Sequence, residues 1–234
     1  GLQGDHPKYY KVLSAPKHFV ANNEEYRRHS GSSEVPMKIL RDYYLPAFKS
    51  SIVDAGAQSI MTAYNALNGI PCTANTFLLQ DILRNEWQFP GWVVTDCGAI
   101  YDIYVNHKYV DDPVEAVALS LKAGTDLNCG SYFRLHLKDA FDQGLVTMEE
   151  IDQALLRIFV TRIKLGVFDP PSMNPYSKIS KDVVDSKPHK ELAHEIALQS
   201  IVLLKNENDV LPLQKNIKSV AVIGPNANFC RFGT

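Results

Sequence analysis

Residues 91–100 read GWVVTDCGAI and carry the clearest structural signal in this chain. The short apolar run from Trp92 to Thr95 predicts a buried strand, and Gly91 marks its start. Asp96 follows where the polar loop begins. On α/β architectures functional side chains lie at the carboxyl ends of parallel strands, so the Asp96 carboxylate is the first candidate for chemistry.

Two segments before Asp96 also carry polar side chains at the end of a predicted strand. Residues 15–19 read APKHF and residues 61–69 read MTAYNALNG, each with polar side chains beside an apolar segment. A third, AGTDL at residues 123–127, follows. If the strands are parallel, polar side chains from all of them gather on one face, namely Lys17, His18, Tyr64, Asp96 and Asp126. Asp126 has a second interpretation, in which it supports the strand ends and does not touch a substrate.

Strands and helices alternate along the chain. Strands are predicted over residues 10–19, 58–63, 91–95 and 125–128, and helices over residues 35–55, 75–87, 113–123, 132–143 and 147–165. Asn75 is a predicted N-cap, Gly56 and Gly124 end their helices, and TMEE at residues 147–150 is a capping box.

Four β-then-α units in series predict parallel strands with right-handed crossovers, in a doubly wound sheet or a (β/α)8 barrel. In a barrel, residues 1–166 are expected to form the C-terminal half, and the first half must come from residues not in this sequence. The Pro- and Ser-containing stretch over residues 167–188 predicts a linker. A helix over residues 189–205 and a strand over residues 219–225 then open a second, truncated α/β domain spanning residues 189–234.

Composition indicates an ordinary soluble globular protein. The 234 residues are 45% apolar and 21% charged, with 24 basic and 26 acidic side chains and a formal charge of -2. These values argue against a nucleic-acid surface, and no apolar stretch reaches the roughly 20 residues that span a bilayer. The four cysteines have no metal-ligand spacing, so neither a metal nor a cofactor is expected. Residues 1–7 lack a signal-peptide pattern, and the chain is expected to be processed or excised.

The strand-end side chains suggest a specific chemistry. Lys17 and His18 would keep a neighbouring Asp96 carboxylate ionised, as the nucleophile of a retaining glycosidase requires, and these two with Arg28 would bind sugar hydroxyls. The alternative is a structural ion pair. The mechanism also needs a protonated carboxyl group about 5–5.5 Å away. Glu24 and Glu25 lie in a loop whose Asn and Arg residues favour the charged form, so they are interpreted as binding or solvent-facing.

The motifs, taken in order, resemble the glycoside hydrolase family 3 enzymes, which include β-glucosidases and β-xylosidases. The resemblance covers nearly the whole chain. Lys17-His18-Phe19 is similar to the family's Lys-His-Phe element, and Arg28 stands at its substrate-binding arginine. MTAYN at residues 61–65 is similar to its Met-x-x-Tyr-Asn strand, and Thr95-Asp96 to its nucleophile. AGTDL at 123–127, SIVLLKN at 200–206 and LPL at 211–213 follow in the family's order.

The resemblance implies a (β/α)8 barrel followed by an α/β sandwich domain. It implies a covalent glycosyl-enzyme at Asp96 and substrate contacts from Lys17, His18, Arg28, Met61 and Tyr64. The acid/base glutamate would come from the second domain beyond residue 234, and an aspartate and an arginine from the first half of the barrel. This chain alone is therefore expected to be inactive. Residues 20–29 lack the Asp-x-His dyad of the related β-N-acetylglucosaminidases, which disfavours that activity and makes His29 a loop or surface residue.

Substrate choice depends on Cys97, which follows Asp96 where many β-glucosidases have Trp and so resembles the β-xylosidase branch. A Cys97–Cys129 disulfide is one hypothesis, and two free buried thiols are the other. A bridge would narrow the pocket and favour pentoses, and it would suit a secreted, periplasmic or cell-wall location. The expected substrate is a small oligosaccharide or aryl β-glycoside. The alternatives are a β-glucosidase and, more remotely, a non-catalytic sugar-binding homologue.

Overall fold

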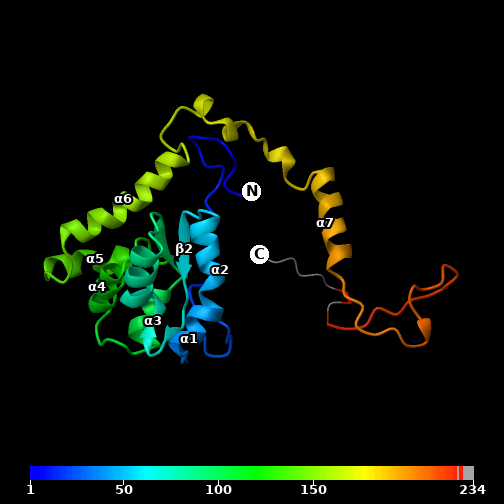
Figure 1. Cartoon of the computed structure of the whole chain (residues 1–234), viewed down its shortest axis with the longest axis horizontal. Helices are drawn as coiled ribbons and strands as arrows, with labels where there is room; N and C mark the ends of the chain where they lie inside the picture. Colours follow the sequence, from blue (N-terminus) through cyan, green and yellow to red (C-terminus); the bar gives the residue numbers. More distant parts are fainter. Residues whose placement is uncertain (226, 229–234) are drawn as a thin grey trace. The chain divides into compact units, whose positions relative to one another are not determined.

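The computed structural model describes residues 1–225, 227 and 228 (Figure 1). The chain divides into two compact units, one of residues 1–178 and one that begins at Ile179. Within the described residues, no helix combines the length and the apolar character needed to cross a membrane.

The first unit contains four parallel strand segments side by side. Strands β2 (Ser59–Thr62) and β5 (Trp92–Thr95) pair in parallel, with Ile60 opposite Val93. Phe19 pairs in parallel with Thr62 on one side, and Leu127 pairs in parallel with Val94 on the other. This arrangement confirms the predicted series of β-α units and the α/β class, as part of a barrel.

The outer two strands are shorter than predicted. Of residues 10–19, only the end follows β2, where Phe19 N donates to Met61 O (2.8 Å) and Met61 N donates to Pro16 O (3.1 Å). The amides of Tyr10 and Lys11 bond instead to Lys164 O and Gln3 O, so the prediction of a strand from residue 10 was wrong. The predicted strand over residues 125–128 is likewise reduced to a single bridge at Leu127.

The helices match the predicted positions with two differences. The segment predicted as one helix over residues 35–55 is a succession of α- and π-helical turns. Pro46, which lacks an amide hydrogen, begins one of them, α2. A seven-residue helix, α3 (Ala99–Val105), follows Asp96 and was not predicted. Up to residue 164, the helical elements are α1 (Met37–Ile39), η1 (Leu40–Tyr44), α2 (Pro46–Lys49), η2 (Ser50–Asp54), η3 (Cys72–Ala74), η4 (Phe77–Glu86), α3, α4 (Pro113–Ala123), α5 (Tyr132–Asp142) and α6 (Met148–Lys164).

The helix ends show the chemistry that the sequence predicts. Asn75 Oδ1 accepts a hydrogen bond from Leu78 N at 3.2 Å, as an N-cap does. Gly124 ends α4 with φ of +111°, a conformation that favours glycine. Thr147 and Glu150 form the reciprocal capping box of α6.

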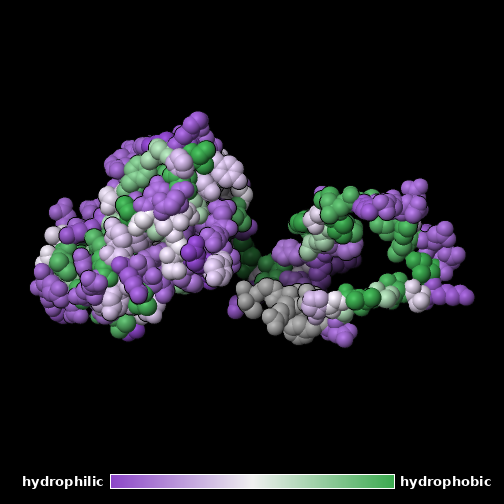
Figure 2. Space-filling model, turned by 90° about the horizontal axis from the view of Figure 1, so that it is seen from below, coloured by the Kyte–Doolittle hydropathy of each residue, from purple (hydrophilic) through white to green (hydrophobic). Residues whose placement is uncertain are grey.

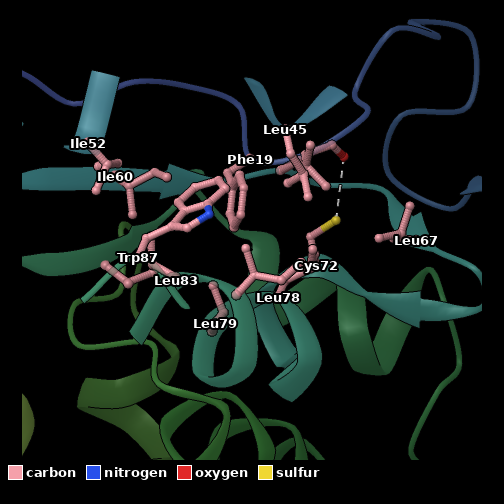
Figure 3. Close-up of a cluster of buried hydrophobic side chains, with 14 of the residues drawn as sticks. Phe19, Leu45, Ile52, Ile60, Leu67, Cys72, Leu78, Leu79, Leu83 and Trp87 are labelled. Atoms are coloured by element: carbon pink, nitrogen blue, oxygen red, sulfur yellow. Dashed lines mark hydrogen bonds between the residues drawn. The ribbon is translucent and has the colours of Figure 1, made fainter. Parts of the chain in front are cut away.

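A hydrophobic core fixes the strand ends that carry the site. Figure 3 shows Phe19 beside Trp87, Ile60 on the other side of Trp87, and Leu78 and Leu83 from η4 beneath them. The Phe19 and Trp87 ring centroids lie 5.9 Å apart, and Phe19 is fully buried. Because Phe19 directly follows His18, its burial sets the position of the His18 backbone.

A small second sheet was not predicted. Its strands are β1 (Ser32–Ser33), β3 (Ala66–Leu67) and β4 (Ile70–Pro71), with β3 parallel to β1 and antiparallel to β4. Two-residue strands are too short to show an alternating pattern. The sheet nevertheless ties the loop after Phe19 to the loop after β2.

The second unit contains α7 (Lys187–Ser200), which ends five residues before the predicted limit at residue 205. Residues 219–223 form no strand, so the predicted strand over residues 219–225 was wrong. A strand needs a hydrogen-bonded partner, and no strand is assigned among the described residues after α7. Val220, Val222 and Ile223 are 70–90% exposed, and Figure 2 shows such apolar side chains on the surface of this unit. Residues 167–188, which were predicted to be a linker, contain only the turns η5 (Pro171–Met173), η6 (Pro175–Lys178) and η7 (Lys181–Val183) and the start of α7. The division between the two units falls within this stretch, after residue 178. The turn η8 (Glu207–Asp209) follows α7.

Candidate active site

Asp96 lies at the carboxyl end of β5 and is held from three sides. Its amide donates to Thr62 O at 3.2 Å, which extends the pairing of β2 with β5 by one residue. One carboxylate oxygen, Oδ1, accepts a hydrogen bond from Cys97 N at 2.7 Å. The other, Oδ2, lies 3.1 Å from His18 Nε2, and the Asp96 side chain is only 14% exposed. The carboxylate is therefore oriented by a backbone amide and an imidazole.

Tyr64, which follows β2, lies next to this carboxylate. Its hydroxyl donates to Cys97 O at 2.8 Å, and the residue is buried. Burial raises the pKa of Tyr64, the negative charge of Asp96 raises it further, and the Arg28 guanidinium opposes both. At neutral pH Tyr64 therefore keeps its hydroxyl proton.

Arg28 is connected to the site by its contact with the ring of Tyr64. Its guanidinium carbon lies 5.0 Å from the Tyr64 ring centroid, within the range of a cation–π contact. Arg28 Nη1 also pairs with Glu25 Oε1 at 3.1 Å, and the Glu25 side chain is 80% exposed. Glu25 is therefore a solvent-facing partner of Arg28, in agreement with the interpretation that it is no buried acid.

The structure does not bring every predicted residue into contact with Asp96. Lys17 is exposed, and none of the hydrogen bonds or ion pairs found in the described residues joins it to the Asp96 carboxylate. Met61 is half-buried in β2, where its backbone bonds to Pro16 and Phe19. His18 thus contacts Asp96 directly, Tyr64 lies beside it, and Arg28 contacts Tyr64. Lys17 and Met61 lie on the neighbouring segments.

Asp126 belongs to the structural scaffold. Its side chain is 1% exposed and pairs with Arg84 Nη2 and Arg157 Nη1, each at 2.8 Å. Asp126 Oδ2 also accepts from Val93 N at 2.8 Å. Burial lowers the pKa of Arg84 to about 10, which leaves it charged at neutral pH. These contacts support the second interpretation of Asp126, because they use its carboxylate to tie β5 to η4 and α6.

A disulfide joins the loop after Asp96 to the loop after the next strand. Cys97 and Cys129 are bridged, with Cα atoms 4.4 Å apart. Gly98 N donates to Cys129 O at 2.7 Å, and Cys129 N donates to Thr95 Oγ1 at 3.0 Å. The residue directly after Asp96 is therefore fixed by covalent and hydrogen bonds. Cys72 is a separate, buried free thiol.

One pair near the site was missed in the sequence. His29, interpreted as a loop or surface residue, has its Nδ1 atom 2.7 Å from Asp102 Oδ2. Its ring centroid lies 4.3 Å from that of Tyr64. Asp102 is buried in α3. The available signal was a single carboxylate inside the apolar run AIYDI at residues 99–103, a pattern that predicts a buried acid once that run is assigned to a helix.

A metal site is not among the features of this region. In the part of the chain that the structure describes, no three His, Cys, Asp or Glu side chains are grouped so that they could hold a metal ion.

Several known proteins are similar to this chain in sequence and fold. A probable exo-1,4-β-xylosidase of Neosartorya fischeri is 46% identical over 97% of this chain and 30% of its own length. A solved GH3 exo-β-xylosidase in complex with a xylobiose aziridine activity-based probe has a TM-score of 0.89 and 38% identity, over 97% of this chain and 30% of that one. A GH3 β-glucosidase of Bifidobacterium adolescentis has a TM-score of 0.68 and 32% identity, over 87% of this chain and 27% of that one.

The chain spans about 30% of the length of the curated relatives it matches. Residues 1–161 match the Glycosyl hydrolase family 3 N terminal domain, and residues 201–234 match the Glycosyl hydrolase family 3 C-terminal domain. With a strand-end carboxylate at the site and these two matches in the expected order, the chain belongs to glycosyl hydrolase family 3.

Proposed function

We propose that the complete protein is a retaining, exo-acting β-glycosidase and that Asp96 is its nucleophile. The observation that carries this proposal is the Asp96 carboxylate at the end of β5, with His18 Nε2 at 3.1 Å from one oxygen and Cys97 N at 2.7 Å from the other. An ionised carboxylate with a fixed orientation is suited to attack a sugar carbon. A merely structural ion pair would not require the neighbouring Tyr64 hydroxyl or the Arg28 guanidinium.

The reaction proceeds in two displacements. An Asp96 carboxylate oxygen forms a bond to the anomeric carbon while the bond from that carbon to the leaving-group oxygen breaks. The leaving oxygen takes a proton from a carboxylic acid, which we place in another part of the same polypeptide. Water then attacks the anomeric carbon, the same acid group accepts its proton, and the Asp96 carboxylate is released. His18, Arg28 and Tyr64, with Lys17 and Met61 beside them, would bind the sugar hydroxyls.

The preferred substrate in this proposal is a terminal β-D-xyloside of a xylo-oligosaccharide. The Cys97–Cys129 bridge stands directly after Asp96. In this proposal it restricts the space in which the hydroxymethyl group of glucose would lie. The relatives named exo-1,4-β-xylosidase support the same choice. The disulfide also suits an oxidising compartment, so we propose a secreted, periplasmic or cell-wall location.

The rest of the polypeptide is required to complete the fold. Apolar side chains of α6 are exposed, among them Leu155, Leu156, Phe159 and Ile163. Exposed apolar surface of this kind marks a contact region. We propose that the remaining part of the barrel covers it, and that this chain alone does not turn over substrate.

Covalent trapping tests the proposal in the complete protein. A 2-deoxy-2-fluoro-xylosyl donor with a dinitrophenolate leaving group should label Asp96, as peptide mass mapping would show, because that leaving group needs little acid assistance. Asp96→Ala should remain folded by circular dichroism and should be unlabelled and nearly inactive. Retained turnover in Asp96→Ala would exclude Asp96 as the nucleophile.

Comparison of this donor with its fluoroglucosyl analogue separates a β-xylosidase from the alternative functions. Rapid labelling by the fluoroglucosyl analogue, with none by the fluoroxylosyl donor, would identify a β-glucosidase, the activity named for a structural neighbour that is 32% identical. Failure of both donors, together with measurable binding of xylose, would identify a non-catalytic sugar-binding protein.

A further inference from the structure

The buried carboxylate of Asp102 lies one contact away from the groups around Asp96. Asp102 belongs to α3, the helix that begins three residues after Asp96, and its side chain is 4% exposed. Its Oδ2 accepts from His29 Nδ1 at 2.7 Å, and its Oδ1 accepts from Asn106 Nδ2. A buried carboxylate without such partners would strongly destabilise the folded state. These two contacts offset that cost for Asp102.

The contacts of His29 define which ring nitrogen carries the proton. Arg28 Nε donates to His29 Nε2 at 3.3 Å, so Nε2 is the acceptor. Nδ1 is then the ring donor, and it donates to Asp102 Oδ2 at 2.7 Å. Asp102, His29 and Arg28 therefore form a continuous series of hydrogen bonds in which each donor and acceptor is matched.

This series ends on a cation that faces the proposed sugar site. The Arg28 guanidinium lies over the Tyr64 ring, 5.0 Å from its centroid, and the His29 ring packs on the same tyrosine at 4.3 Å. The Tyr64 hydroxyl in turn donates to Cys97 O, next to Asp96. Arg28 also forms an ion pair with Glu25. The Glu25 side chain is 80% exposed, so it restrains the position of the Arg28 guanidinium only weakly.

A second histidine connects Asp102 to Tyr64 through the backbone. His107 N donates to Asp102 O at 2.7 Å, and His107 Nε2 lies 2.8 Å from Tyr64 O. The polypeptide around Asp102 thus contacts both residues on which Arg28 depends, namely His29 and Tyr64.

From these contacts we infer that Asp102 and His29 are positioning residues: the buried Asp102 carboxylate fixes the His29 ring, and His29 fixes the Arg28 guanidinium over Tyr64 for sugar binding. The inference rests on the proposed function. Arg28 touches the substrate in it, whereas Asp102 and His29 act through Arg28. Their removal should weaken sugar binding more than it slows the covalent step.

The decisive variant is His29→Phe in the complete enzyme. Phenylalanine keeps an aromatic ring against Tyr64 but has no nitrogen to accept from Arg28 or to donate to Asp102. With a nitrophenyl β-xyloside we expect KM to rise about 10-fold with kcat changed less than about 3-fold, as for a loss of uniform binding. Asp102→Asn should change KM in the same direction. Asp142→Asn, which breaks an exposed ion pair on α5, is the matched control and should leave both constants unchanged.

A double-mutant cycle separates positioning from general stabilisation. In an Arg28→Ala background, His29→Phe should have no further effect on KM, because its effect is transmitted through Arg28. Additive effects, a His29→Phe enzyme with wild-type KM, or an Arg28→Ala enzyme with wild-type KM would each overturn the inference. If Asp102→Asn does not fold, the His29→Phe cycle alone decides. Failure of the wild-type enzyme to be labelled at Asp96 by either fluoro-sugar would overturn the proposed function instead, so the two failures are distinguishable.

Discussion

At the scale of single residues, the site depends on how each polar side chain is held. Asp96 has a contact on each carboxylate oxygen, and only one of these contacts comes from another side chain, His18. The neighbouring Lys17 has the larger permanent charge but is exposed. The orientation of the Asp96 carboxylate is therefore set by a histidine and a backbone amide.

Removal of the His18 side chain is expected to impair the reaction. A hydrogen bond to a charged group contributes about 1.5–3 kcal/mol, so His18→Ala should lower kcat/KM about 10- to 150-fold in the complete enzyme. Steady-state kinetics with an aryl β-xyloside measures the change. His194→Ala on α7, where no residue is buried, is the control. Equal kcat/KM values in the two variants would show that His18 has no role in the reaction.

Cys72 is predicted to be unreactive in the native protein. Its thiol is fully buried and donates weakly to Val20 O, as Figure 3 shows by its dashed line, and burial raises the pKa of Cys72 from 9.0 to about 12. At pH 8 only about one thiol in 10,000 is then ionised. The raised pKa also means that this group favours folding below pH 9 and loses that contribution as the pH approaches 12.

Iodoacetamide at pH 8, followed by peptide mass mapping, measures this reactivity. Cys72 should be alkylated in guanidinium chloride and not in buffer. Alkylation in buffer at the rate of a free thiol peptide would show that the core around Cys72 opens readily.

At the scale of elements, strand ends and helix starts place the functional groups. Asp96 lies at the end of β5, and the turn through Gly98 leads directly into α3. Asp102, which belongs to α3, contacts His29. Local sequence predicted the long, regular helices well, because their caps and periodic apolar residues are contained within them. It missed α3, whose seven residues make barely two turns.

The capping box of α6 provides a test at this scale. Thr147→Ala removes the side chain that accepts from Glu150 N, and should lower the free energy of unfolding by about 0.5–2 kcal/mol. Ser131→Ala is a suitable control, because Ser131 precedes α5 and makes no side-chain capping bond. Urea denaturation of both variants measures the difference, and an equal loss in the two would contradict the role of the cap.

At the scale of the whole molecule, the Cys97–Cys129 disulfide is a long-range restraint, because the two cysteines are 32 residues apart. Closing a loop of this length contributes about 4 kcal/mol in the chain-entropy model. The double variant Cys97→Ser/Cys129→Ser should therefore unfold at lower urea concentration by a corresponding amount.

The same variant tests the proposed specificity. Without the bridge, the loop after Asp96 gains freedom, and we expect the ratio of glucosidase to xylosidase activity in the complete enzyme to rise several-fold. Cys72→Ala controls for the loss of a cysteine elsewhere. An unchanged ratio would mean that the bridge stabilises the loop without selecting the sugar.

The series of β-α units, the regular helices with their caps and the place of Asp96 at a strand end could all be predicted from the sequence. These features depend on local periodicity and on residues near one another in the chain. How far the outer strands pair, and which polar groups contact one another, could be learned from the folded protein alone. The ion pairs of Asp126 and the Asp102–His29–Arg28 series join residues from different elements. The exposure of Lys17 is set by the packing between elements. Strand pairing and the burial of charge depend on partners distant in the chain, and no local pattern specifies those partners.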